Sequence, residues 1–155
     1  MAVLVALAGC GPSGFEALVA EYDLRGEAVV RLGPDYAVAA RALPGGAEVI
    51  GFLRQENGEW TAQQLASSEL AGPNGVQMVS YGGETGEEWN TFVYGVAARE
   101  VSRVVLEGRL GEGGQVIGGA WVVALRERDL GPRDIHWRFL SARGGVLASG
   151  SGITP

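Results

Sequence analysis

Short apolar runs separated by glycine-rich turns are the feature that most constrains the fold of this chain. The 155 residues include 26 glycines, and most of these glycines lie between the apolar runs. Runs this short, bounded by Gly, Pro, Asn and Asp, are typical of β-strands joined by tight turns. The chain is 46% hydrophobic and 19% charged, which is the composition of a folded globular protein. The sequence therefore predicts a mainly β protein.

The expected strands form two groups on either side of a polar, glycine-rich segment at residues 82–88. The first group covers 27–32, 36–43, 48–55, 59–65 and 75–81, and the second covers 91–96, 101–107, 115–117, 120–125, 135–141 and 146–149. Asn57-Gly58 predicts a two-residue hairpin loop. The regular spacing of the second group predicts a β-sandwich. Residues 120–125 are apolar throughout, which predicts a strand buried on both faces.

One short helix is expected over residues 14–22. Ser13 and Glu16 have the spacing of a capping box, in which the two side chains satisfy free backbone N–H groups at a helix start. An apolar stripe at helical spacing follows, formed by Phe15, Leu18, Val19 and Tyr22. We expect the helix to close near Gly26 and its stripe to dock onto a sheet.

The apolar segment at residues 2–9 ends at the single cysteine, Cys10. A helix of this length spans about 12 Å, far less than the roughly 30 Å hydrocarbon core of a bilayer, but it has the length of the apolar part of a signal peptide. Leu7-Ala8-Gly9-Cys10 resembles the lipobox of bacterial lipoproteins. In that family the cysteine sulfur receives a diacylglyceryl group, and cleavage leaves the cysteine as the first mature residue. The resemblance implies a signal peptide at 1–9 and a lipid-anchor tether at 10–14.

Two features bear on this interpretation of Cys10. No Arg or Lys precedes the apolar run, so the positively charged region of a signal peptide is missing, as it would be if the start codon were assigned too far downstream. A single cysteine suits an exported protein that forms no internal disulfide. The alternative is an ordinary buried strand that ends in a core cysteine.

The charge balance excludes several functions. The net charge is −6, with nine acids and four arginines in residues 1–80 and nine acids and eight arginines in the rest. Neither part is basic, which argues against a nucleic-acid partner and against binding of the folded body to an anionic membrane.

All twelve basic residues are arginine. A P-loop, a pyridoxal Schiff base and a lysine general base are therefore excluded.

No catalytic constellation stands out. His136 is the only histidine, so a zinc site is not expected, and no cofactor is implied. Asp134 lies two residues away on the same face of the expected strand, but there is no Gly-x-Ser-x-Gly motif and no serine stands out as a nucleophile. The remaining acidic candidates fall in expected loops, where solvated charge explains them: Glu87, Glu88, Glu127 and Asp129.

The tryptophans are the other candidate binding residues. Trp121 and Trp137 lie within apolar strands and are expected in the core. Trp89 follows an acidic loop at a loop-to-strand junction. An exposed aromatic ring stacks on sugars or peptide side chains, so Trp89 is the predicted ligand contact.

A second resemblance concerns the fold. It rests on Phe92-Val-Tyr-Gly95, Val101-Ser-Arg-Val104-Val105, Gly119-Ala-Trp121 and Gly144-Gly145-Val146-Leu147. This pattern resembles uncharacterised small bacterial lipoproteins with an immunoglobulin-like β-sandwich, preceded by an antiparallel sheet whose hairpin carries a tryptophan, as Trp60 does here. It covers most of residues 25–152 and implies two modules in series, at 15–82 and 83–155, and it supplies no catalytic residue that could be assigned to this chain.

The expected function is that of a non-enzymatic binding or interaction module of the cell envelope. It would be exported and held on the outer side of the cytoplasmic membrane through its lipid alone, with a protein or small-ligand partner that the residues do not identify. The alternatives are an envelope hydrolase that uses unidentified carboxylates and a structural subunit of an envelope assembly. A cleft with two close carboxylates would favour the hydrolase, and an exposed apolar patch would favour the interaction module.

Overall fold

The computed structural model describes residues 14–24, 29–80, 91–107, 113–125 and 134–153. These residues form one helix and eleven strands: α1 (Gly14–Glu21), β1 (Val29–Arg31), β2 (Tyr36–Leu43), β3 (Gly46–Arg54), β4 (Trp60–Glu69), β5 (Val76–Ser80), β6 (Thr91–Val96), β7 (Val101–Leu106), β8 (Gly113–Gln115), β9 (Ala120–Leu125), β10 (Asp134–Ser141) and β11 (Val146–Ile153). The protein is mainly β, as the sequence predicts.

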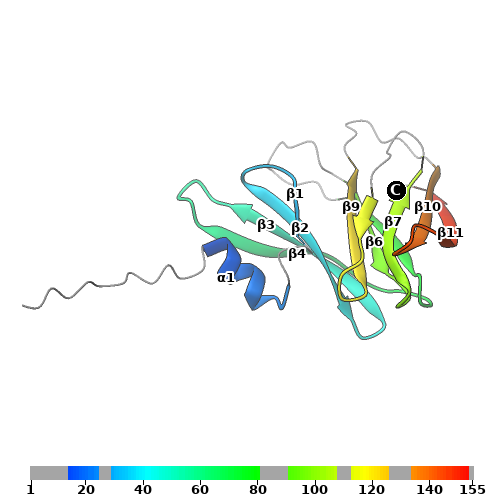
Figure 1. Cartoon of the computed structure of the whole chain (residues 1–155). Coiled ribbons are helices and arrows are strands. Elements are labelled where there is room, and N and C mark those ends of the chain that lie inside the picture. Colours follow the sequence, from blue (N-terminus) through cyan, green and yellow to red (C-terminus); the bar gives the residue numbers. More distant parts are fainter. Residues whose placement is uncertain (1–13, 25–28, 81–90, 108–112, 126–133, 154–155) are drawn as a thin grey trace, which may run out of the picture.

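The strands build three antiparallel sheets. The N-terminal sheet has the order β1-β2-β3-β4, the central sheet β5-β6-β9, and the C-terminal sheet β11-β10-β7-β8. Figure 1 shows the central sheet between the other two, with α1 beside the N-terminal sheet at the far end of the molecule. The described residues are therefore arranged as one helix and three stacked sheets.

Helix α1 covers one face of the N-terminal sheet. Its predicted apolar stripe packs on side chains of β2 and β3, and the rings of Phe15 and Tyr22 lie 5.7 and 6.0 Å from that of Phe52. The helix ends earlier than the expected closure near Gly26, because Asp23 takes a left-handed conformation with φ 55°. The N–H groups of Asp23 and Leu24 donate to the carbonyls of Ala20 and Val19, which satisfies the last turn in a Schellman motif.

Two tight turns set the register of the N-terminal sheet. Pro44-Gly45 joins β2 to β3 by a two-residue turn, in which Gly45 has φ 78°, a conformation that glycine adopts at no steric cost. The hairpin of β3 and β4 is confirmed, but its loop is longer than predicted. The Gly58 N–H donates to the Gln55 carbonyl, so Glu56 and Asn57 occupy the centre of the turn and Gly58 follows with φ 83°. The loop thus has three residues rather than two.

The central sheet is covered on both faces. All six residues of β9 are buried, as predicted for this apolar run. Trp121, Val123 and Leu125 pack against the C-terminal sheet, while Ala120, Val122 and Ala124 pack against the N-terminal sheet. Because successive side chains of a strand point to opposite faces, one strand contributes to both cores.

The central and C-terminal sheets together form the predicted immunoglobulin-like sandwich, with three strands facing four. The fourth strand of the larger sheet, β8, pairs with β7. Strand β5, which lies before the predicted module boundary, pairs with β6 of this sandwich. The two predicted modules share a core, in which β2 and β3 pack on β6 and β9, and Ser68 and Tyr94 hydroxyls hydrogen bond at 2.6 Å. The boundary predicted between 82 and 83 lies outside the described residues and stays a prediction.

Candidate functional site

Both residues that the sequence singled out as sites lie outside the described residues. Cys10, the predicted lipidation site, and Trp89, the predicted ligand contact, fall in the segments 1–13 and 81–90. The acidic candidates also fall outside the described residues, and they are Glu87, Glu88, Glu127 and Asp129. Their roles stay predictions, and the candidate site is therefore sought among the residues that the structure describes.

Two of the other tryptophans are core residues, as predicted. Trp121 is 1% exposed and Trp137 is 9% exposed, and both belong to the core between the two sheets of the sandwich. Trp60 is different, because it is only partly buried and packs beside α1. It is therefore the described tryptophan that is available to a ligand.

His136 lies on the outer face of the C-terminal sheet. It is exposed, as are Asp134 and Arg138, while Ile135 and Trp137 between them point into the core. This confirms that His136 and Asp134 share a face.

The register adds a residue that the sequence did not indicate, because it places Ser151 of β11 directly opposite His136. Serine, histidine and aspartate are the groups of a hydrolase triad. Here, however, Ser151 and His136 are exposed on an open sheet face, and no hydrogen bond joins the two side chains in the described structure. An open face supplies neither a cavity that excludes water nor fixed donors for an oxyanion. Within the described residues, no group of three or more His, Cys, Asp or Glu side chains is placed to hold a metal ion.

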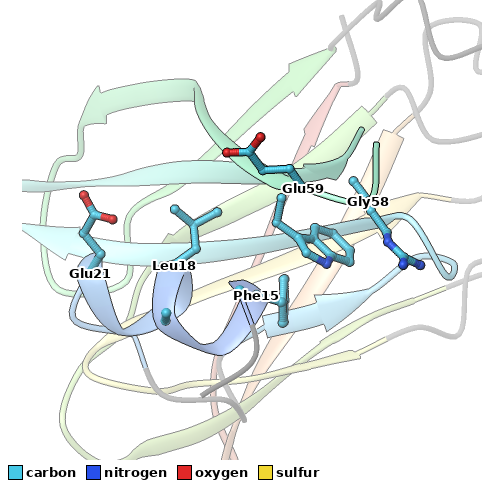
Figure 2. A pocket seen from close by; sticks show the side chains of 9 residues that line it. Phe15, Leu18, Glu21, Gly58 and Glu59 are labelled. Carbon is cyan, nitrogen blue, oxygen red and sulfur yellow. The ribbon is translucent and has the colours of Figure 1, made fainter. Parts of the chain in front are cut away.

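A groove between α1 and the β3–β4 hairpin brings aromatic and charged side chains together. We call it the helix–hairpin groove. Figure 2 shows Phe15, Leu18 and Glu21 on its helix side and Gly58 and Glu59 on its hairpin side. Its volume is about 450 Å³, within the range of small-ligand sites. It is lined by Gly14, Phe15, Ala17, Leu18, Glu21, Arg54, Gly58, Glu59 and Trp60.

Aromatic rings form one wall of the helix–hairpin groove. The Phe15 and Trp60 ring centroids are 4.5 Å apart. The Arg31 guanidinium carbon lies 3.7 Å from the Phe15 centroid and 5.1 Å from that of Trp60, a cation–π arrangement that holds both rings in place. The described lining therefore offers stacking surface and charges of both signs, and among its described residues there is no Ser, Cys, Thr or His. These side chains are suited to binding through stacking and ionic contacts.

Local sequence patterns do not indicate that Phe15, Arg31 and Trp60 meet. Phe15 belongs to the helix stripe, Arg31 to β1 and Trp60 to the start of β4, and only the docking of α1 brings them together. The three-residue loop that ends at Gly58 fixes where β4 begins, and thereby where Trp60 points.

A buried ionic network ties the end of α1 to the same sheet face. Glu48 is 6% exposed and its carboxylate is fully engaged. Arg41 Nε donates to Oε1 at 2.7 Å, and Gln64 Nε2 donates to Oε2 at 3.0 Å. Arg41 Nη1 also donates to the Tyr22 carbonyl at 3.0 Å, just past the helix. Because every oxygen of Glu48 is bonded, this carboxylate is a structural group and not a free base.

Arg41→Ala is expected to destabilise the protein by about 1.5–3 kcal/mol, because it leaves a buried carboxylate with only Gln64 as a partner. Arg54→Ala is the matched control. Its partner Asp35 is 3.7 Å away and the two side chains are 48% and 53% exposed, so the loss should be about 0–1 kcal/mol. Urea denaturation followed by circular dichroism measures both. Equal losses would show that the Glu48 network is no stronger than a surface pair.

No described helix is long and apolar enough to cross a membrane. Comparison of the chain with models of protein families, with curated proteins and with solved structures finds no match. The function is therefore argued from the residues and the geometry alone.

Proposed function

We propose that this chain is an exported lipoprotein, held on the outer side of the cytoplasmic membrane through a lipid on Cys10, whose folded body is a non-enzymatic interaction module. The motif Leu7-Ala8-Gly9-Cys10 supports the anchor. The position of the first described element is compatible with it. Helix α1 begins at Gly14, so cleavage before Cys10 would remove no described helix or strand.

The observation that carries the interaction role is the chemistry of the described surface. The described lining of the helix–hairpin groove consists of aromatic, aliphatic and charged side chains, among which are the carboxylates of Glu21 and Glu59. Outside the groove, the carboxylates of Asp35, Glu48 and Glu107 are each paired with an arginine. The aromatic rings and the charges of both signs support recognition of a partner through stacking and ionic contacts.

The helix–hairpin groove also lies close to the proposed anchor. Gly14 lines the groove and is four residues after Cys10, a segment that spans at most about 14 Å when extended. A ligand bound beside Phe15 and Trp60 would therefore be held near the membrane surface. The proposed module thus acts on partners at the membrane rather than on partners far from it.

Cys10→Ala is expected to release the protein from the membrane fraction without unfolding it. A diacylglyceryl cysteine supplies two acyl chains, which is what stable anchoring requires. The measurement is labelling with an alkyne analogue of palmitate in a bacterial host, together with membrane fractionation and circular dichroism. Wild type should carry the label and sediment with membranes, and the variant should do neither. A Pro12→Ala variant, changed just beyond the motif, should behave as wild type.

A variant that stays with the membrane, or a wild type that takes up no label, would contradict the anchor. Deletion of residues 1–12 gives a second check, because the proposal requires the remaining chain to fold. Loss of the β-sheet spectrum on this deletion would instead favour a buried strand ending at Cys10.

A further inference from the structure

Strand β11 is an edge of the sandwich in the described structure, and its protection is limited to a bulge at Leu147, which has no partner in β10. It is the outermost strand of the C-terminal sheet and pairs with β10 on one side. On its other side, no strand of the described chain pairs with it. Edge strands often carry charged residues or proline, which prevent their free N–H and C=O groups from pairing with other strands. Residues 146–153 contain neither.

Exposed apolar side chains gather on the same strand. Among the described residues, four large hydrophobic side chains are exposed, and three of them belong to β11. They are Val146 at 54%, Leu147 at 50% and Ile153 at 64%, while the fourth is Val30 of β1 at 37%. The exposed apolar surface that would favour an interaction module is thus concentrated on an edge.

Packing within the chain explains only the inward residues of β11. A Cβ atom at Gly150 would lie 2.6 Å from Trp137 Nε1 and would clash with that ring, and one at Gly152 would lie 3.0 Å from Met78 Cε, in tight contact. The outward row of β11 is exposed and consists of Leu147, Ser149, Ser151 and Ile153, with Leu147 at the bulge in the pairing with β10. Among the described residues, both ends of this row are half exposed or more, at 50% for Leu147 and 64% for Ile153.

The row is nearly symmetric about Gly150. In an antiparallel pair, residues directly opposite each other point to the same face of the sheet. If β11 met a second β11 about a two-fold axis at Gly150, then Leu147 would lie opposite Ile153 and Ser149 opposite Ser151. Apolar side chains would meet apolar ones and hydroxyls would meet hydroxyls. Such self-complementarity is what a two-fold interface between identical chains requires.

We infer that β11 pairs antiparallel with β11 of a second copy of this chain. The pairing joins two four-stranded sheets into one continuous sheet across the dimer. The backbone supplies the hydrogen bonds, and the Leu147–Ile153 contact occurs twice. Because β11 carries no charge, the pairing avoids the like-charge repulsion that the net charge of −6 would cause between other surfaces. The inference goes beyond the proposed function, because it adds an interaction surface on β11 that is separate from the helix–hairpin groove, and it does not require the lipid on Cys10.

The test uses the full chain with Cys10→Ser, so that neither a lipid nor a native disulfide contributes to association. Sedimentation equilibrium should show a reversible dimer. Leu147→Lys should shift the equilibrium toward monomer by roughly tenfold or more. Val30→Lys, which makes the same change at an exposed position of β1, should leave it unchanged. A chain that is monomeric at every concentration, or a dimer that Leu147→Lys does not weaken, would overturn the inference.

The register is tested by disulfide trapping. In the same background, one preparation carries Ser149→Cys and another Ser151→Cys. Directly opposite Cα atoms in an antiparallel pair are about 4.5–5.5 Å apart, within disulfide range, whereas diagonal neighbours are about 7–8 Å apart. The mixture should therefore form a covalent dimer and each preparation alone should form little. Equal trapping in all three samples, or none in the mixture, would exclude this pairing.

The experiments test the β11 pairing and the lipid anchor on Cys10 independently. Loss of membrane attachment with an intact dimer would refute only the lipid on Cys10. A monomer that stays attached through Cys10 would refute only the pairing of β11.

Discussion

Trp121→Ala is expected to lower the free energy of unfolding by about 3–5 kcal/mol, the usual cost of removing a buried large aromatic side chain. Trp121 is 1% exposed and is among the largest fully buried side chains of the described structure. Its ring lies 6.1 Å from that of Phe139 at an interplanar angle of 77°, so it joins the two sheets of the sandwich edge to face. Domains of this size have a total stability of about 5–15 kcal/mol. The expected loss is therefore a large part of the total free energy of unfolding.

Trp121→Phe is the matched variant. Trp121 Nε1 is buried and has no hydrogen-bond partner in the described structure, so phenylalanine removes volume but breaks no hydrogen bond. We expect a loss below about 2 kcal/mol, because an aromatic ring still faces Phe139. Thermal unfolding should separate the two variants, with a fall of roughly 10 °C or more for alanine. An unchanged melting temperature in Trp121→Ala would show that this ring does not hold the sandwich together.

Most strands could be predicted because turn residues bracket apolar runs. The bounds of β2, β6 and β9 agree with the expected ranges, since each run is bounded by clear turn or polar residues. Strands β4 and β11 each extend well past their predicted ends at residues 65 and 149. Strand β4 continues to Glu69 past a bulge between its partners Val49 and Ile50, which breaks the period-two pattern. Strand β11 continues to Ile153 although Gly and Ser disfavour strands, because pairing with β10 outweighs local propensity.

The stacking of three sheets could not be predicted from local sequence patterns. A run such as Ala120–Leu125 shows that both of its faces are buried, but not which sheets cover them. The pairing of β5 with β6 spans the segment where the module boundary was expected, so composition alone assigned β5 to the other side. Long-range pairings of this kind depend on the whole topology rather than on any window of residues.

The helix–hairpin groove and the β11 edge could not be predicted from the sequence for the same reason. Phe15, Arg31 and Trp60 are far apart in the sequence and meet only through the docking of α1. The symmetry of β11 is visible in the residues themselves, but it has meaning only once the strand is known to be an edge. The sequence could indicate Cys10 because a lipid-attachment motif is contiguous, whereas binding surfaces are not.

Gly95→Ala is expected to destabilise the protein by about 3 kcal/mol or more, through steric conflict rather than through a lost contact. Gly95 is a buried residue of β6 that pairs with Val76 and Trp121 on its two sides. A Cβ atom there would lie 2.2 Å from the Gly75 carbonyl oxygen and 3.2 Å from Trp121 Cζ2. The same carbonyl accepts a hydrogen bond from the Val96 N–H at 3.1 Å, so the start of β5 is held against β6. The oxygen belongs to the backbone and cannot rotate away.

Gly33→Ala separates this steric effect from the general effect of replacing glycine. Gly33 has no heavy atom within 4 Å of the position that a Cβ would occupy, and its φ is not in the left-handed region. Alanine there should change stability by less than about 1 kcal/mol, with a gain from the lower entropy of the unfolded chain. Urea denaturation of the two variants gives the comparison. If Gly95→Ala unfolded at the wild-type midpoint, the close approach of the Gly75 carbonyl to Gly95, and with it the tight contact between the start of β5 and β6, would be wrong.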